Sequence, residues 1–117
     1  KNVFQTGDDI SVRVYFKQNK TLDDINLGFG LHNLENTYIF DSNTLWDRAN
    51  TKEFLKRGYA QIEFKNIPLK TGAYYIKTIL RDKDFNSIYD YLGKSEIFSI
   101  QSKKRTSGIV DLDFNWK

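Results

Sequence analysis

Side chains that suit saccharide recognition gather around Trp46. Its neighbours supply amides, carboxylates and one guanidinium: Asp41, Asn43, Asp47, Arg48 and Asn50. An indole ring can cover the apolar C–H face of a pyranose while forked polar groups bind the hydroxyls. Trp46 and Arg48 are therefore candidate binding residues, and the alternative is that Trp46 packs its loop onto the core.

A second group of candidates follows from strand spacing. Tyr75, Lys77 and Arg81 alternate along one face of an expected strand, and Tyr89 and Tyr91 extend a polar-aromatic surface in the next segment. The single histidine points away from the apolar side of its own strand and could be solvated, hydrogen-bonded or in contact with a ligand. Chosen for exposure and chemistry, the candidate carbohydrate-binding residues are His32, Trp46, Arg48, Tyr75, Lys77 and Arg81.

The residue types present in the sequence argue against catalysis. One histidine would have to serve any Ser-His-Asp scheme, and no nucleophile motif accompanies it. The carboxylate pairs Asp8-Asp9 and Asp23-Asp24 lie in turn sequences, where such residues usually cap or form Asx turns. Cysteine is absent, which excludes disulfides and thiolate metal sites. We expect no catalytic residues, no metal and no cofactor.

The length and the charge of the chain narrow the possible classes of protein further. The chain has 117 residues, which fits one domain over 1–117, and its start at Lys1 suggests a fragment of a larger protein. Lys and Arg number 18 against 15 Asp and Glu, and the excess equals the one run Lys103-Lys104-Arg105. A nucleic-acid binder would spread its cations along a face, so we expect no nucleic-acid partner. No apolar run reaches the roughly 20 residues of a membrane helix.

The elements that position these residues are strands. Apolar and polar residues alternate with a period of two in most segments: 10–16 (ending at Phe16), 27–32, 38–40, 60–65, 74–81, 97–100 and 110–116. Turn-forming clusters separate most of them. About eight one-sided strands predict an all-β fold, an antiparallel β-sandwich of the immunoglobulin-like or jelly-roll type.

Three local patterns add to this prediction. Residues 43–56 have loosely helical spacing, which predicts one or two helical turns inside a long loop. The sequence Leu69-x-x-Gly72-x-Tyr74 places a tyrosine after a turn at the start of a strand, the pattern by which Greek-key sandwiches tie a corner through the phenol. Gly28-x-Gly30 lacks the rest of a dinucleotide fingerprint and indicates instead a place where a backbone or ligand comes close.

An ordered set of segments resembles the C-terminal domain of Wzt, the nucleotide-binding subunit of bacterial O-antigen polysaccharide ABC transporters. These segments are 4–8, 29–31, 40–44, 69–74 and 108–116. The resemblance implies a noncatalytic β-sandwich that binds the modified non-reducing end of the glycan at the cytoplasmic side of the inner membrane. It also implies a homodimer that exchanges the C-terminal strand, with residues 101–107 as a polar hinge, and transporter subunits as partners.

Two other classes stay open at this stage. An extracellular adhesion-type sandwich would come with a secretion signal and neighbouring repeats. An ancillary carbohydrate-binding module of a polysaccharide-degrading enzyme would sit beside a catalytic domain and bind internal glycan segments. A Walker A motif upstream of Lys1 would instead indicate the transporter subunit.

Overall fold

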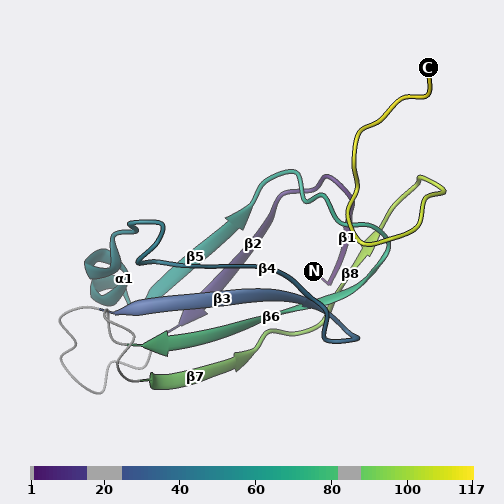
Figure 1. Cartoon of the computed structure of the whole chain (residues 1–117). Helices are drawn as coiled ribbons and strands as arrows, with labels where there is room; N and C mark the ends of the chain where they lie inside the picture. The colour runs from purple at the N-terminus through teal and green to yellow at the C-terminus, as the bar shows by residue number, and fades with distance from the viewer. Residues whose placement is uncertain (1, 16–24, 82–87) are drawn as a thin grey trace.

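The computed structural model describes residues 2–15, 25–81 and 88–117, and it is a β-sandwich (Figure 1). Within these residues the chain forms eight strands and one helix. In chain order they are β1 (Val3–Gln5), β2 (Ile10–Tyr15), β3 (Asn26–Asn33), β4 (Tyr38–Asn43), α1 (Thr51–Arg57), β5 (Tyr59–Phe64), β6 (Gly72–Arg81), β7 (Ile88–Lys94) and β8 (Phe98–Gln101). Phe16, Asp23 and Asp24 lie outside the described residues.

The strands form two sheets of unequal size. Six strands make the larger sheet in the order β1-β8-β6-β3-β4, with β7 also paired to β6, and β2 pairs with β5 in the smaller sheet. All of these pairs are antiparallel except β1–β8, which is parallel. Figure 1 shows the two layers, with α1 at one end and both chain termini toward the other.

The core lies between the two sheets, as the alternation predicts. Ile10 of β2 packs with Leu31 and Ile76 of the larger sheet, and Val14 packs with Leu27 and Leu80. Each of these side chains is at least nine-tenths buried. Burying a large aliphatic side chain stabilises a fold by roughly 1.5–3 kcal/mol, so these pairs hold the sheets together.

The tyrosine corner forms as predicted. The hydroxyl of Tyr74 donates to the backbone carbonyl of Lys70 at 2.7 Å, and the ring is buried against Phe98. A Cβ on residue 72 would come within 3.2 Å of that hydroxyl, which explains the glycine. The corner fixes where the long strand β6 begins.

The strand predictions succeed for six segments and fail for the last. Residues 110–116 do not form a strand: only Val110 bridges to Leu69, and the chain then leaves the sandwich. To continue that pairing along β5 the chain would have to pass the bend at Asn66, whose backbone is left-handed with φ of 49°. The structure still has about as many strands as predicted, because β1 and β7 form in addition to the six confirmed segments.

Candidate functional site

One face of the larger sheet carries most of the predicted binding residues, and we call it the outer face. It consists of the side chains of β3, β4 and β6 that point away from the smaller sheet: Asn26, Gly28, Gly30, His32, Tyr38, Asp41, Asn43, Tyr75, Lys77, Ile79 and Arg81. The two glycines of β3 confirm that these side chains lie on the same face. A Cβ on Gly28 would meet Ile79 and Asn43, and one on Gly30 would meet His32 and Tyr38.

At one end of the outer face, His32 and Tyr75 form a buried stack. The two rings are 5.2 Å apart and nearly parallel, and Tyr38 closes on the imidazole edge-on at 5.2 Å. His32 is 9% exposed and Tyr75 only 4% exposed. The expectation that both are exposed is wrong, because the side-chain-free Gly30 lets the imidazole lie over the strand, where the two rings cover it.

Hydrogen bonds fix the rings that surround His32. The hydroxyl of Tyr75 bonds to the side-chain oxygen of Asn36, which lies in the β3–β4 turn with φ of 62°. A hydrogen bond to Asp41 raises the pKa of Tyr38, with smaller contributions from burial and from the carboxylate charge. This end of the outer face is therefore a closed aromatic wall, of which only Tyr38 is well exposed.

The middle of the outer face has a residue without a side chain between two charged residues. Gly30 lies between Lys77 of β6 and Asp41 of β4 in the strand register. Lys77 and Asp41 are both exposed. A cation and a carboxylate thus flank a position that has no side chain, an arrangement in which both could reach one polar ligand.

At the far end, a turn after β4 presents Trp46. Leu45 N–H donates to the side chain of Asn26 at 3.3 Å, and Trp46 N–H donates to that of Asn43 at 2.9 Å. Both acceptors are buried members of the outer face, so the turn lies on that side of the sheet. The Trp46 side chain is 64% exposed, which rules out the alternative that it packs into the core.

Further contacts hold this turn in shape. Ser42 donates to the carboxylate of Asp47 at 2.7 Å, and Ala49 N–H donates to the carbonyl of Thr44 at 3.0 Å. Arg48 adopts φ of 53°, a left-handed conformation that costs an ordinary residue about 1 kcal/mol and that these bonds offset. Helix α1 begins just beyond, with Asn50 as its N-cap.

The six predicted residues thus lie at three places along one face. His32 and Tyr75 lie at the aromatic wall, Lys77 lies in the middle, and Arg81 lies opposite Asn26 near the turn that carries Trp46 and Arg48. His32 lies six positions after Asn26, which corresponds to about 20 Å along a strand. Sequence reasoning missed Tyr38, because a register shift between Leu31 and His32 brings it opposite His32 and no period-two pattern reveals such a bulge.

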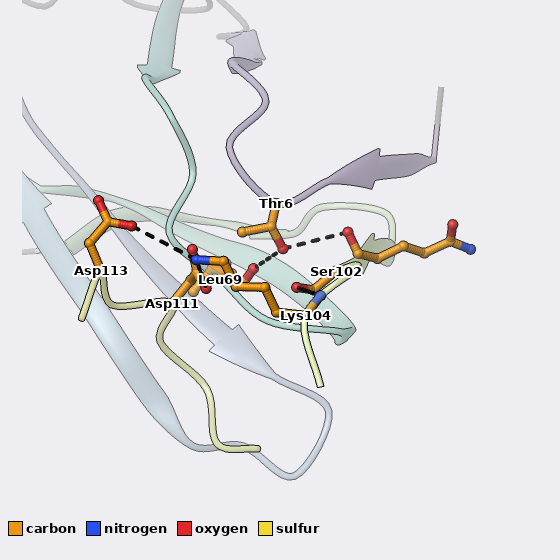
Figure 2. Close-up of polar contacts among 7 residues, drawn as sticks. Thr6, Leu69, Ser102, Lys104, Asp111 and Asp113 are labelled. Carbon is orange, nitrogen blue, oxygen red and sulfur yellow. Dashed lines mark hydrogen bonds and ion pairs between the residues drawn. The ribbon is translucent and has the colours of Figure 1, made fainter. Parts of the chain in front are cut away.

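The C-terminal tail, residues 109–117, is a second feature of interest. Its first residues are held in place: Lys70 N–H donates to the carbonyl of Ile109, and Asp111 N–H donates to that of Pro68. Figure 2 shows Lys104 between Asp111 and Asp113, at 3.5 and 3.8 Å from their carboxylates, and Thr6 donating to the carbonyl of Leu69.

Beyond Asp111 the tail is exposed. Leu112, Phe114 and Trp116 are 68%, 62% and 92% exposed, and they alternate with Asp113 and Asn115. An alternating segment of this kind matches a strand with one buried face, yet no strand of the described chain pairs with it after Val110. The tail is therefore a strand sequence without a sheet.

No group of three or more histidine, cysteine, aspartate or glutamate side chains in the described part of the chain could hold a metal ion. Among the same residues, no helix has the length and apolar character that a membrane span requires.

The fold defines a small β-sandwich domain. Residues 1–112 match the family model of the Wzt C-terminal domain, and the chain belongs to that family. A solved structure described as the C-terminal domain of Wzt superposes with a TM-score of 0.58 at 13% sequence identity, covering 97% of this chain and 72% of that chain. At this identity the likeness concerns the fold alone. No curated protein matches the chain. The family supports a role in an O-antigen ABC transporter.

Proposed function

We propose that the chain is a noncatalytic carbohydrate-binding domain that recognises the modified non-reducing end of a bacterial O-antigen polysaccharide for export by an ABC transporter. The observation that carries the proposal is Trp46, held exposed by a hydrogen-bonded turn at one end of the outer face. An accessible indole beside polar side chains suits a pyranose, and the family supplies the polysaccharide context.

Each part of the outer face has a role in this proposal. Trp46 stacks on a sugar ring, Arg48 and Arg81 donate to hydroxyls or to an anionic substituent nearby, and Lys77 with Asp41 binds hydroxyls over Gly30. His32 and Tyr75 are positioning residues, because they are buried and shape the wall rather than touch a ligand with their ring faces. Affinity is weak to moderate, since binding displaces well-hydrated hydroxyls from an exposed face.

We also propose a homodimer in which the tail of one protomer completes the sandwich of its partner. The alternation of Leu112, Phe114 and Trp116 supports this, because each is exposed in the single chain and would be buried in a sheet. Phe40 of β4 is also exposed, at an edge of the inner side where it contacts Phe29. Unpaired apolar strands of this kind readily exchange between identical copies.

The structure suggests a later hinge than the polar segment 101–107. Ile109 and Asp111 are bonded to their own chain, and Lys104 pairs with Asp111 (Figure 2). The longer pair of Lys104 with the fully exposed Asp113 would have to break on exchange. We therefore place the exchanged piece at residues 112–117, with the turn at Gly108 (φ of 101°) retained within each protomer.

The remaining partners follow from the family. We propose that the chain is one domain of a longer nucleotide-binding subunit, located at the cytoplasmic face of the inner membrane beside the membrane subunits of the transporter.

Titration calorimetry with O-polysaccharide from the source organism, with and without its terminal modification, tests the proposal. The domain is expected to bind the modified chain at least tenfold more tightly. Trp46→Ala should weaken that binding roughly 5- to 30-fold, the equivalent of about 1–2 kcal/mol for a lost ring contact. Lys77→Ala should also weaken it, whereas Lys52→Ala on α1, an exposed lysine away from the outer face, should not.

Equal affinity for the two polysaccharides would contradict recognition of the terminus and favour a module that binds internal segments. Unchanged binding in both Trp46→Ala and Lys77→Ala would contradict the assignment to the outer face. The thermal midpoint of each variant should stay near that of the wild type, because both side chains are exposed.

A further inference from the structure

On the opposite side of the sandwich, at the exposed face of β2 and β5, two arginines stack on one tyrosine ring: Arg13 of β2 and Arg57, the last residue of α1. The guanidinium carbons of Arg13 and Arg57 lie 4.6 and 4.3 Å from the centroid of the Tyr59 ring. The two guanidiniums are therefore neighbours, because both lie against the same ring. We call Arg13, Tyr15, Arg57 and Tyr59 the arginine–tyrosine cluster.

Both guanidiniums are fixed in place by a second contact. The Nε of Arg13 donates to the side-chain oxygen of Gln61 at 2.9 Å, and the Nε of Arg57 donates to the carbonyl of Tyr59 at 2.9 Å. Arg57 also lies 5.1 Å from the ring centroid of Phe54. Stacking and the Nε bond together remove much of the rotamer freedom that a ligand would otherwise have to restrict.

The charges of this pair are not neutralised within the described chain. Neither arginine has a carboxylate within salt-bridge distance among residues 2–15, 25–81 and 95–117. The nearest acidic side chain in the register, Glu63, pairs with Lys65 and accepts from Gln61. Apart from the hydrogen bond of Arg13 to Tyr15, the terminal amino groups of the two guanidiniums thus remain for an oxyanion, which such groups bind in a bidentate manner.

An exposed aromatic ring lies beside the two cations. Tyr15 is 66% exposed and its ring centroid is 5.7 Å from that of Tyr59, directly opposite in the strand register. A side-chain hydrogen bond to Tyr15 raises the pKa of Arg13, with a smaller contribution from Tyr59, so this arginine stays charged. A flat, half-apolar ring carrying an anionic group would contact Tyr15 and both guanidiniums together.

We propose that the arginine–tyrosine cluster is a second ligand site, separate from the outer face, that binds an acidic saccharide through its carboxylate or phosphate. The two arginines hold the anionic group and Tyr15 covers the sugar ring. The positive charge of the two arginines favours an acidic sugar over a neutral one. The exposed ring of Tyr15 favours a saccharide over a bare anion.

Chemical-shift titration of the domain with glucuronic acid, glucose 6-phosphate, glucose and inorganic phosphate tests this site. Glucuronic acid or glucose 6-phosphate should shift the backbone amides of β2 and β5 and bind at least fivefold more tightly than glucose and than inorganic phosphate. Arg13→Gln and Arg57→Gln should each weaken binding about tenfold, as expected for a lost charge-assisted hydrogen bond. Lys65→Gln, which removes an exposed cation just after β5, should not.

Four results would overturn the proposal. These are no binding of either acidic sugar, inorganic phosphate binding as well as glucose 6-phosphate, shifts confined to β3, β4 and β6, or an unchanged affinity in both arginine variants. Because Trp46→Ala leaves β2 and β5 untouched, it should bind the acidic sugar like the wild type. This variant separates failure of the second site from failure of the outer-face proposal.

Discussion

Replacing Phe114 in the tail by alanine should weaken dimerisation if the tail is exchanged. The Phe114 side chain is 62% exposed in the single chain, and complete burial of such a side chain contributes roughly 1.5–3 kcal/mol. The part still to be buried therefore corresponds to about 1–2 kcal/mol per tail. A dimer contains two tails, so its free energy should fall by about 2–4 kcal/mol and its Kd should rise roughly 30- to 1,000-fold.

Sedimentation equilibrium over a range of protein concentrations measures this Kd. Asn115→Ala is the matched control, because the neighbouring residue alternates to the other side of the tail and should change the Kd little. Deleting residues 112–117 should give a folded monomer, since no described residue of the core depends on them. A Phe114→Ala protein that dimerises as tightly as the wild type, or a dimer that survives the deletion, would refute the exchange.

The other predictions concern stability and the shape of the outer face. Tyr74→Phe removes the buried bond to the Lys70 carbonyl and should cost about 1–1.5 kcal/mol, a fall of about 4–6 °C in Tm by calorimetry; an unchanged Tm would show that the corner is not a stabilising contact. Burial, with a smaller contribution from Glu35, raises the pKa of Tyr74. The resulting stability is therefore complete below the ordinary tyrosine pKa near 10 and is lost as the pH rises through the raised value. Chemical denaturation should show a smaller alkaline loss of stability in Tyr74→Phe than in the wild type, and equal losses would argue against this origin. Gly30→Ala places a Cβ 3.0 Å from His32 Nε2 and should destabilise the fold by roughly 1–3 kcal/mol in urea while weakening glycan binding, so a neutral effect on both would contradict the packed wall.

The alternation of apolar residues was sufficient to predict the sandwich, because one-sided burial leaves a period-two record along each strand. The corner at Tyr74 was predictable for a similar reason, since its turn and its tyrosine are close in sequence. Strand β1 has only three residues and pairs in parallel with β8, which lies far along the chain. No local sequence pattern therefore predicts it.

The shared face of the candidate residues was predictable, and their burial was not. Strand spacing correctly placed Tyr75, Lys77 and Arg81 on one face. It could not show that His32 and Tyr75 bury each other, because that depends on the space over Gly30 and on a bulge that brings Tyr38 across from His32.

The tail shows a third limit of sequence reasoning. Its alternating residues are those of a strand, and the prediction of a strand over 110–116 was wrong for the single chain because no sheet edge of its own receives it past the bend at Asn66. A pattern of this kind indicates the need for a pairing partner without saying which copy of the chain provides it.

The most direct test of the central claim is a map of backbone amide shifts during titration with the terminally modified O-polysaccharide. If the outer face is the binding site, the largest shifts should fall on β3, β6 and residues 44–50, and Trp46→Ala should reduce them. Shifts confined to other parts of the sandwich, or no shifts at saturating polysaccharide, would contradict the assignment.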